Sequence, residues 1–330
     1  MNLPAEVSLG QGSDLMPEGP EVRRYADLLA ASLTGSAIRK VSARTRQARS
    51  WLDEHGESLD GRRLTTICSR GKHLIGYIEG NVYFHSHLMM WGRWRVDPSE
   101  PEFDRRERAR IVTEAGTAVL SSAPVFEIGS GDPFENVEHL RSIGPDILPY
   151  EGIAAFDRDV FRRRLLSPAH CRYTIGAALL DQQLVAGIGN YLRCEILYCC
   201  GINPWRTVSA LSEPEIGCLS ATIPLLARRA YERSGTTVSD EEKQRLGSEP
   251  GLVYQAGREY GTRHYVFRRT NLPCLRCGST IRQQRQVTRF DEEGEHTRIT
   301  YFCPDCQGVD VEPRAAARAA RSSSGRQRRA

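Results

Sequence analysis

Apolar and polar residues alternate in short stretches along the first third of the chain, after one helical segment that opens at Glu21. The clearest alternating stretches are residues 63–68, 73–78 and 82–85. Alternation of this kind, broken by turn residues, is typical of antiparallel strands that bury one face. Residues 97–108 are crowded with charge and lack an apolar period, so we expect a loop there. The pattern predicts a β-sandwich or barrel over residues 16–135.

From about residue 150 the apolar period becomes helical. We expect four helices, over residues 161–166, 175–184, 191–200 and 213–233. Residues 236–262 are polar and contain glycines, which predicts a mobile loop. A compact cysteine-bearing module follows. The pattern therefore predicts a helical domain at 136–264 and a small module at 265–307.

Both ends of the chain differ from the domains between them. Residues 308–330 are rich in arginine, alanine and serine and have too little apolar content to fold, so we expect a disordered basic tail. Residues 1–15 lack the basic start and apolar core of a secretion signal. The sequence has no run of about eighteen apolar residues, which excludes a membrane-spanning helix. We therefore expect a cytoplasmic protein, associated with the nucleoid if it binds DNA.

The formal net charge of +4 comes from the tail. Six arginines and two acidic residues lie in 307–330, and the remaining chain balances 39 basic against 39 acidic residues. Global charge therefore gives no argument for nucleic-acid binding. Local charge does, because residues 258–289 hold eight arginines and a single acidic residue, Glu259. Such a segment is a plausible phosphate-binding face.

Four of the ten cysteines form two Cys-x-x-Cys pairs, Cys274 with Cys277 and Cys303 with Cys306. Two such pairs 25 residues apart predict a closed tetrahedral zinc site, which is structural because four thiolates leave no open position. Residues 291–294 would form the hairpin tip between the pairs. In a reducing compartment we expect no disulfide framework. The other six cysteines are interpreted as small core residues: Cys68, Cys171, Cys194, Cys199, Cys200 and Cys218.

The most informative stretch is Pro17-Glu18-Gly19-Pro20, directly after Met16. If the chain began at Pro17, its secondary amine would lie at a helix N-terminus, which disfavours positive charge and leaves a useful fraction unprotonated near neutrality. A free secondary amine attacks an electrophilic carbon and forms an iminium. Glu18 beside it supplies a carboxyl for proton transfer. The alternative is an ordinary proline-containing helix cap.

Three further motifs carry weaker signals. Gly187-Ile188-Gly189-Asn190 joins two helices, and Asn190 would cap the second, whose amides can receive a phosphate; an ordinary helix hairpin is the alternative. Arg70-Gly71-Lys72 places a lysine at a strand start, which is also typical of a solvated strand end. His85 and His87 share a strand face, for which we favour packing or phosphate contact over metal binding. Met89 and Met90 belong either to the core or to a wedge that enters a base stack.

In chain order, the PEGPE start, the Arg-Gly-Lys strand, the Gly-x-Gly-Asn turn and the Cys₄ module resemble the formamidopyrimidine-DNA glycosylase/endonuclease VIII family of base-excision repair enzymes, over residues 16–307. The resemblance implies an α+β multidomain fold: an N-terminal β-sandwich with flanking helices, a helix–two-turn–helix domain and a C-terminal Cys₄ zinc-finger hairpin. It implies one structural zinc ion, no small-molecule cofactor, damaged DNA as the partner, and a monomer.

The resemblance also assigns roles to matching residues. Pro17 would be the nucleophile that attacks C1′ and expels the base, and Glu18 the proton donor that assists sugar opening. Lys72 would serve in β-elimination and phosphate contact, Asn190 would grip a phosphate, and Arg298 would contact the lesion phosphate and assist δ-elimination. The DNA-binding candidates that remain are Met90 and Met89, which would fill the space left by the flipped base, and Arg141, one place before the position expected for an arginine.

Within the family, the segments around Leu180-Asp181-Gln182, Asn190-Tyr191-Leu192-Arg193 and Val266-Phe267-Arg268 fit the endonuclease VIII branch. That branch implies a bifunctional glycosylase/AP lyase that removes oxidised pyrimidines such as thymine glycol. The purine branch, acting on 8-oxoguanine and formamidopyrimidines, is the first alternative. A non-catalytic binder of damaged DNA is the second, and a zinc-ribbon protein of translation or transcription is the least favoured.

The residues before Met16 matter for the chemistry, because a peptide-bonded proline nitrogen is not nucleophilic. Three explanations are open: translation starts at Met16 and the methionine is removed, the extension is cleaved later, or the protein binds DNA without catalysis. We favour the first, because the residues whose evident use is catalysis, Glu18, Lys72 and Arg298, are all in place.

Overall fold

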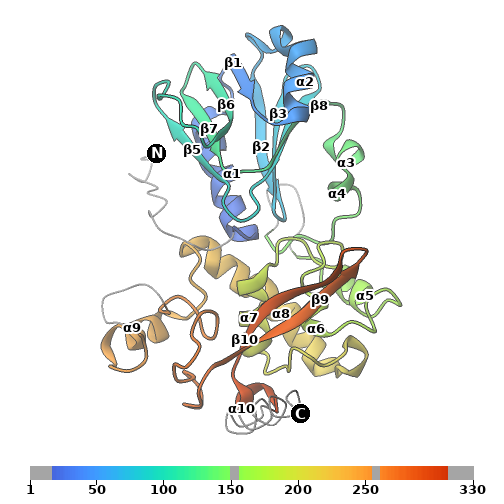
Figure 1. The fold of residues 1–330 in the computed structure, drawn as a ribbon, viewed down its shortest axis with the longest axis vertical. Helices are drawn as coiled ribbons and strands as arrows, with labels where there is room; N and C mark the ends of the chain where they lie inside the picture. Colours follow the sequence, from blue (N-terminus) through green and yellow to red (C-terminus); the bar gives the residue numbers. More distant parts are fainter. Residues whose placement is uncertain (1–16, 149–155, 255–260, 311–330) are drawn as a thin grey trace, which may run out of the picture.

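The protein is described by a computed structural model that covers residues 17–148, 156–254 and 261–310. Figure 1 shows a β-rich half above a half built from helices and a long hairpin. The expected extension, residues 1–15, lies outside the described residues, as does the basic tail from residue 311 onward. No helix among the described residues is long and apolar enough to cross a membrane.

The N-terminal half is a sandwich of two four-stranded antiparallel sheets, as predicted. One sheet has the order β1 (Ile38–Ala43), β6 (Glu107–Thr113), β7 (Thr117–Ser121), β5 (Arg93–Asp97). The other has the order β2 (Leu64–Arg70), β3 (His73–Ile78), β4 (Val82–His87), β8 (Val125–Ser130). The expected loop at 97–108 is confirmed except at its two ends, which belong to β5 and β6.

Helix α1 (Gly19–Leu33) runs beside the sandwich and points its N-terminus at the other half (Figure 1). Pro20 lies in the first turn, where a missing N–H costs no hydrogen bond. Val22, Ala26, Leu29 and Leu33 recur at helical spacing and are buried in the sandwich core. Helix α2 (Arg46–His55) and the 3₁₀ turn η1 (Gly56–Leu59) flank the same domain. The apolar stripe of α1 thus fixes where its first residues stand.

Two short helices, α3 (Pro133–Asn136) and α4 (Glu138–Arg141), lead from β8 to the helical domain. That domain contains α5 (Arg158–Leu165), α6 (Ile175–Ala178), α7 (Asn190–Cys199), η2 (Val208–Ala210), α8 (Glu213–Glu232) and α9 (Asp240–Ser248). Every residue of α7 from Tyr191 to Tyr198 is buried, so this helix is the centre of the domain.

The helix expected over 175–184 is wrong beyond Ala178, where α6 ends after four residues. Asp181 explains the end, because its side chain accepts a hydrogen bond from the Gln183 N–H and so favours a turn. Its other carboxylate oxygen lies 2.9 Å from His170 Nε2. The apolar residues that follow are buried in turns rather than in a helix, and the apolar period does not distinguish the two.

The loop expected over 236–262 is also corrected, because α9 lies within it. Ser239 and Glu242 form a capping box at the start of α9, and this signature is readable in the sequence. Residues 255–260 of the expected loop lie outside the described residues.

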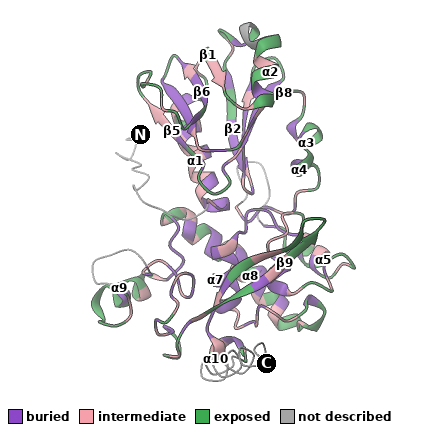
Figure 2. Cartoon of the chain, in the orientation of Figure 1, coloured by how far each residue is buried: buried purple, intermediate pink, exposed green. Residues whose placement is uncertain are grey.

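The C-terminal module is a two-stranded hairpin of β9 (Arg282–Asp291) and β10 (Gly294–Phe302), followed by α10 (Pro304–Gln307). Its tip falls at residues 291–294, as expected. Figure 2 shows that much of the hairpin surface is exposed. Near its base the hairpin packs on α6 and α7, so the central helix of one domain supports the module of the next.

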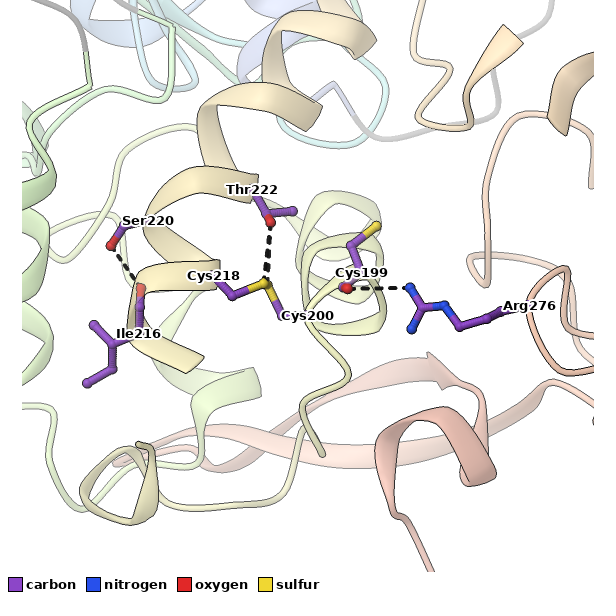
Figure 3. The surroundings of a disulfide bond; sticks show 7 residues. All are labelled: Cys199, Cys200, Ile216, Cys218, Ser220, Thr222 and Arg276. Atoms are coloured by element: carbon purple, nitrogen blue, oxygen red, sulfur yellow. Dashed lines mark hydrogen bonds between the residues drawn. A yellow bond between two sulfur atoms is a disulfide. The ribbon is translucent and has the colours of Figure 1, made fainter. Parts of the chain in front are cut away.

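One expectation for the cysteines is wrong. Cys200, at the end of α7, and Cys218, on α8, form a disulfide with a Cα–Cα distance of 5.8 Å (Figure 3). The prediction failed because it rested on the expected reducing compartment, whereas packing of α7 on α8 brings the two thiols together. Cys68 and Cys194 are buried, as expected, whereas Cys171 and Cys199 are only half-buried.

Candidate active site

The carboxylate of Glu18 is held at the N-terminus of α7, in the other domain. Its oxygens accept hydrogen bonds from the backbone N–H groups of Gly189 at 2.7 Å, Tyr191 at 2.7 Å and Leu192 at 3.2 Å. The first turn of a helix has unpaired amides and a partial positive charge, so a carboxylate fits there. Glu18 is 2% exposed. Pro17, which directly precedes it, is half-buried.

Burial raises the pKa of Glu18 to about 8, above the ordinary range of a carboxyl group. The nearby positive charge of Lys72 and the amides of α7 oppose this rise, and the charge of Glu21 adds to it. A carboxyl group that keeps its proton near neutrality is suited to act as a general acid. The same three amides fix its position.

Two glycines allow α1 to approach the turn before α7. The Gly19 N–H donates to the Gly187 carbonyl oxygen at 2.8 Å, and a Cβ on Gly19 would stand 3.0 Å from the Gly187 Cα. Gly187 has a φ of +105°, a conformation that other residues rarely adopt. The two glycines therefore place Pro17 and Glu18 against the Gly-x-Gly-Asn turn.

Glu21, which is half-buried, forms a second link between α1 and α7. Its carboxylate accepts from the Glu18 N–H at 2.9 Å and from the Tyr191 hydroxyl at 3.0 Å. Burial raises the pKa of Glu21 to about 7, against the lowering effect of these hydrogen bonds. The folded protein therefore binds a proton at Glu21 that the unfolded chain releases near pH 4.5.

This difference predicts a pH-dependent effect of Glu21→Gln. The wild-type folded state loses stability as the pH rises from about 4.5 through about 7, because the buried group must ionise, whereas the glutamine variant carries no such group. Relative to wild type, the variant should gain about 1–3 kcal/mol of unfolding free energy between pH 5 and pH 8. Urea unfolding at the two pH values measures this gain. A difference that does not change with pH would contradict the assignment.

Lys72 lies in the tight turn between β2 and β3 and faces the same site. Gly71 has a φ of +55°, and a Cβ there would come within 2.9 Å of the Ala186 Cβ and 3.0 Å of the Gly187 nitrogen. Burial lowers the pKa of Lys72; the charge of Glu18 raises it, and that of Arg298 lowers it further. Glu18 and Arg298 therefore both lie within electrostatic range of Lys72.

Asp146 fixes this turn, a role that the sequence analysis missed. Its carboxylate accepts from the Gly71 N–H at 2.6 Å and from the Leu148 N–H at 2.9 Å, and it is buried. Asp146 also pairs with Ala186 in a short parallel bridge. The turn that carries Lys72 is thus fastened to the segment that leads to α7.

Arg298 and Asn190 belong to two elements that meet. Arg298 lies on β10, opposite Gln286 of β9, and is exposed. The Asn190 side chain donates from Nδ2 to the carbonyl oxygen of the next residue, Ile299, at 3.0 Å. The expectation that Asn190 caps α7 is wrong, because Gly189 is the N-cap and Asn190 is the first residue of the helix, where its side chain contacts the strand that carries Arg298.

Met89 and Met90 stand at the tip between β4 and β5. They are 51% and 54% exposed, and the neighbouring Trp91 is 63% exposed. Met89 has a φ of +53°, and its N–H donates to His87 Nδ1 at 3.1 Å. The core interpretation of these residues is wrong, and the wedge interpretation remains a prediction. Arg141, at the end of α4, is exposed and donates from Nε to the Glu135 carbonyl oxygen.

Histidines of β3 and β4 form a buried hydrogen-bonded series that begins next to Lys72. His73 Nδ1 lies 2.8 Å from His85 Nε2, and His85 Nδ1 lies 3.2 Å from a carboxylate oxygen of Glu127. Burial lowers the pKa of His87 to about 4, and the charge of Lys72 lowers it further. The favoured packing interpretation agrees with this arrangement, and a phosphate contact by His87 remains a prediction.

The four cysteines of the two Cys-x-x-Cys pairs form one cluster, with all ligand atoms within 4.8 Å of one another. The sulfur of Cys277 lies 3.5 Å from that of Cys303 and 3.4 Å from that of Cys306, and the sulfurs of Cys274 and Cys306 lie 3.8 Å apart. Four sulfurs bound to zinc at about 2.3 Å would lie about 3.8 Å apart. The donor set therefore fits a tetrahedral zinc ion.

Glu195, in the middle of α7, is a second residue that the sequence analysis missed. It is fully buried and accepts from the N–H groups of Tyr265, Val266 and Phe267 at 2.7–2.9 Å, and from the Thr237 hydroxyl at 2.6 Å. It thereby fixes the segment that leads into the zinc module. A glutamate among apolar helical residues was the signal in the sequence that could have found it.

Known proteins resemble the chain over nearly all of the described domains. A family model described as the formamidopyrimidine-DNA glycosylase N-terminal domain matches residues 16–122, and one described as the H2TH domain of the same enzyme matches 143–242. Endonuclease 8 of Salmonella paratyphi B is 32% identical over 294 residues, which cover 88% of this chain and 100% of that protein. Endonuclease 8 of Enterobacter sp. (strain 638) is 33% identical over the same length.

Solved structures show the same likeness. The formamidopyrimidine-DNA glycosylase of Lactococcus lactis, bound to DNA that contains an abasic site, superposes with a TM-score of 0.69 at 25% identity. The match covers 88% of this chain and 99% of that one. The similarity therefore spans the sandwich, the helical domain and the hairpin together.

Proposed function

Because the chain belongs to the formamidopyrimidine-DNA glycosylase/endonuclease VIII family, whose members are DNA glycosylases with AP lyase activity, we propose that it removes oxidised pyrimidines from DNA through a Schiff base on Pro17. The observation that carries the proposal is the Glu18 carboxyl group, buried and held by three helix amides directly after Pro17. Such a group is placed to give a proton beside a nucleophilic amine.

In the first step, the Pro17 nitrogen forms a bond to C1′ of the damaged nucleotide, and the bond from C1′ to the base breaks. The base leaves with the electron pair of that bond and takes up a proton, and the nitrogen releases the proton that it carried, which restores its lone pair. The C1′–O4′ bond then breaks, O4′ accepts the proton of Glu18, and the nitrogen lone pair completes the iminium. The raised pKa of Glu18 favours this transfer near neutral pH.

In the second step, the iminium acidifies the C2′ proton. Loss of that proton breaks the C3′–O bond, and the 3′ phosphate leaves by β-elimination. Loss of a further proton, from C4′, releases the 5′ phosphate by δ-elimination. Lys72, whose pKa is lowered by burial, serves the first elimination, and Arg298 contacts the lesion phosphate and assists the second.

The DNA-binding residues follow the same assignment. Asn190 grips a phosphate at the start of α7, Met90 and Met89 fill the space of the flipped nucleotide, and Arg141 contacts the backbone. The exposure of the two methionines at a turn supports the wedge role. One zinc ion at Cys274, Cys277, Cys303 and Cys306 holds the hairpin that presents Arg298.

We choose oxidised pyrimidines over oxidised purines as the proposed lesions because of sequence identity. The chain is 32–33% identical to the Endonuclease 8 relatives and 25% identical to the Lactococcus enzyme. The purine branch is the alternative, and the choice of lesion in the following experiment separates the two.

The test is borohydride trapping on a thymine-glycol duplex, with protein that begins at Pro17 compared with the full 330-residue chain. Borohydride reduces the iminium to a stable amine, so each Schiff base becomes a covalent adduct. We expect an adduct with the free proline, mapped to Pro17 by peptide mass, and none when the proline nitrogen is in a peptide bond.

Duplexes with 8-oxoguanine or a preformed abasic site are the controls. Faster trapping on 8-oxoguanine than on thymine glycol would move the chain to the purine alternative. No adduct on any duplex with either form would overturn the proposal and leave a non-catalytic binder of damaged DNA.

A further inference from the structure

Arg193 is a fully buried arginine on α7, the central helix of the helical domain, three residues after Asn190. It is among the largest side chains that are removed completely from water. A buried guanidinium is costly unless acceptors surround it. The hydrogen-bond partners of Arg193 therefore indicate its role in the structure.

The guanidinium joins α7 to the hairpin and to α6. From Nη1 it donates to the Gly176 carbonyl oxygen and to Gln286 Oε1, both at 3.1 Å. From Nη2 it donates to Thr300 Oγ1 at 3.0 Å and to Asn190 Oδ1 at 2.7 Å. Nη2 also donates to the Ile299 carbonyl oxygen at 3.5 Å, and the contact with Asn190 is the shortest of the five.

This contact decides which way the Asn190 amide points. An arginine has only donors, so the oxygen of the amide must face it, and the NH₂ group must face away. The NH₂ group then meets the Ile299 carbonyl oxygen at 3.0 Å, on the strand that carries Arg298. With the amide reversed, two donors would face each other at Arg193, and two acceptors would meet at Ile299.

The other contacts hold Arg193 itself in place. Gln286 accepts from Arg193 and from the Thr300 hydroxyl at 2.9 Å, and its own NH₂ group donates to the Pro204 carbonyl oxygen at 2.8 Å. A Cβ at Gly176 would come within 2.5 Å of Gln286. This tight surround leaves the guanidinium little freedom to turn away from Asn190.

We propose that Arg193 is a positioning residue that fixes the Asn190 amide with its NH₂ group outward, as the donor for a DNA phosphate. When DNA binds, the NH₂ group exchanges the Ile299 carbonyl oxygen for a phosphate oxygen. Arg193 does not touch DNA. The inference rests on the proposed function only in taking Asn190 as the phosphate contact.

A double-mutant cycle tests this role, with Asn190→Ala, Arg193→Gln and the double variant in the Pro17 form. Binding is measured on a duplex with a tetrahydrofuran abasic analogue and on an undamaged duplex. One hydrogen bond to a charged group corresponds to a loss of affinity of about 10-fold or more. We expect each single variant to lose about this much, and the double variant to bind no more weakly than Asn190→Ala. Losses that multiply would overturn the proposal.

Thr300→Val is the matched control, since it removes the hydroxyl that accepts from Arg193 and donates to Gln286 but leaves the bond from Arg193 to Asn190. It should change affinity less than about 2-fold. If Arg193→Gln fails to fold, Arg193→Lys replaces it in the same cycle, because lysine keeps the charge without the planar fork. Thermal unfolding of every variant shows whether the fold is intact.

The salt dependence of binding separates positioning from direct contact. A side chain that neutralises a phosphate contributes about one unit to the slope of log affinity against log salt. Arg193→Gln should leave the slope unchanged, and a fall of about one unit would show direct contact and overturn the proposal. Equal affinity of the wild type for both duplexes would instead count against lesion recognition, and the cycle on undamaged DNA would still decide the role of Arg193.

Discussion

Glu18→Gln should lower base excision by about 100- to 10,000-fold, the usual contribution of a positioned general acid. Glutamine has nearly the same shape but has no proton to give to O4′ when the sugar ring opens. It also presents an NH₂ group to a pocket lined by the N–H groups of Gly189, Tyr191 and Leu192. Single-turnover excision from a thymine-glycol duplex, with the Pro17 form of each protein, measures the loss.

The matched control is Glu21→Gln, which replaces a neighbouring half-buried carboxyl group on the same helix. It should keep base excision within about 10-fold of wild type, since Glu21 is not placed in the proton transfer. A preformed abasic site offers an open-chain aldehyde without ring opening by Glu18, so Glu18→Gln should cleave it far better than it excises a base. Equal losses in the two Gln variants would show that burial of charge, rather than the acid, determines the rate.

Cys303→Ser should abolish both lesion binding and strand cleavage by removing one ligand of the Cys₄ cluster. Structural zinc contributes about 10–16 kcal/mol to the folding of small domains. Cys274 and Cys303 are also buried in the core that contains α7 and α8. Loss of the ion should therefore release the hairpin with Arg298 and loosen the contacts of Asn190 and Arg193 with β10.

Cys171→Ser is the control for this experiment, since Cys171 is half-buried and lies outside the cluster. The zinc content of each protein is measured by mass spectrometry, and DNA binding by fluorescence anisotropy. We expect one zinc ion per chain in wild type and in Cys171→Ser, and none in Cys303→Ser. Full binding by a zinc-free Cys303→Ser protein would contradict the structural role of the metal.

The sequence was sufficient for the parts of this protein that depend on local spacing. Two Cys-x-x-Cys pairs with a turn between them predict the Cys₄ hairpin, and alternation predicts β2, β3 and β4. Catalytic roles for Glu18, Lys72 and Arg298 followed from the family resemblance, and in the structure Glu18 and Arg298 both lie within electrostatic range of Lys72.

What the sequence did not predict depends on partners that are far away along the chain. Asp146, Arg193 and Glu195 are each explained by bonds to segments many residues distant. Glu195 stands out as a glutamate among apolar helical residues, but no local pattern identifies the partners of any of the three. The disulfide of Cys200 with Cys218 likewise arises from the packing of α7 on α8. The prediction for α6 failed for a local reason instead. A turn at Asp181 interrupts an apolar run whose spacing is helical, so the helix is shorter than expected.

The hydrogen bonds of Glu18 join residues that are 171 to 174 positions apart. Contacts of such long range close late in folding, after helices and hairpins that need only near neighbours. During refolding, secondary structure should therefore return before catalytic competence does. A newly made chain would complete its sandwich first, and Glu18 would become buried against the amides of α7 only when the two domains dock, so the proton donor reaches its catalytic environment last.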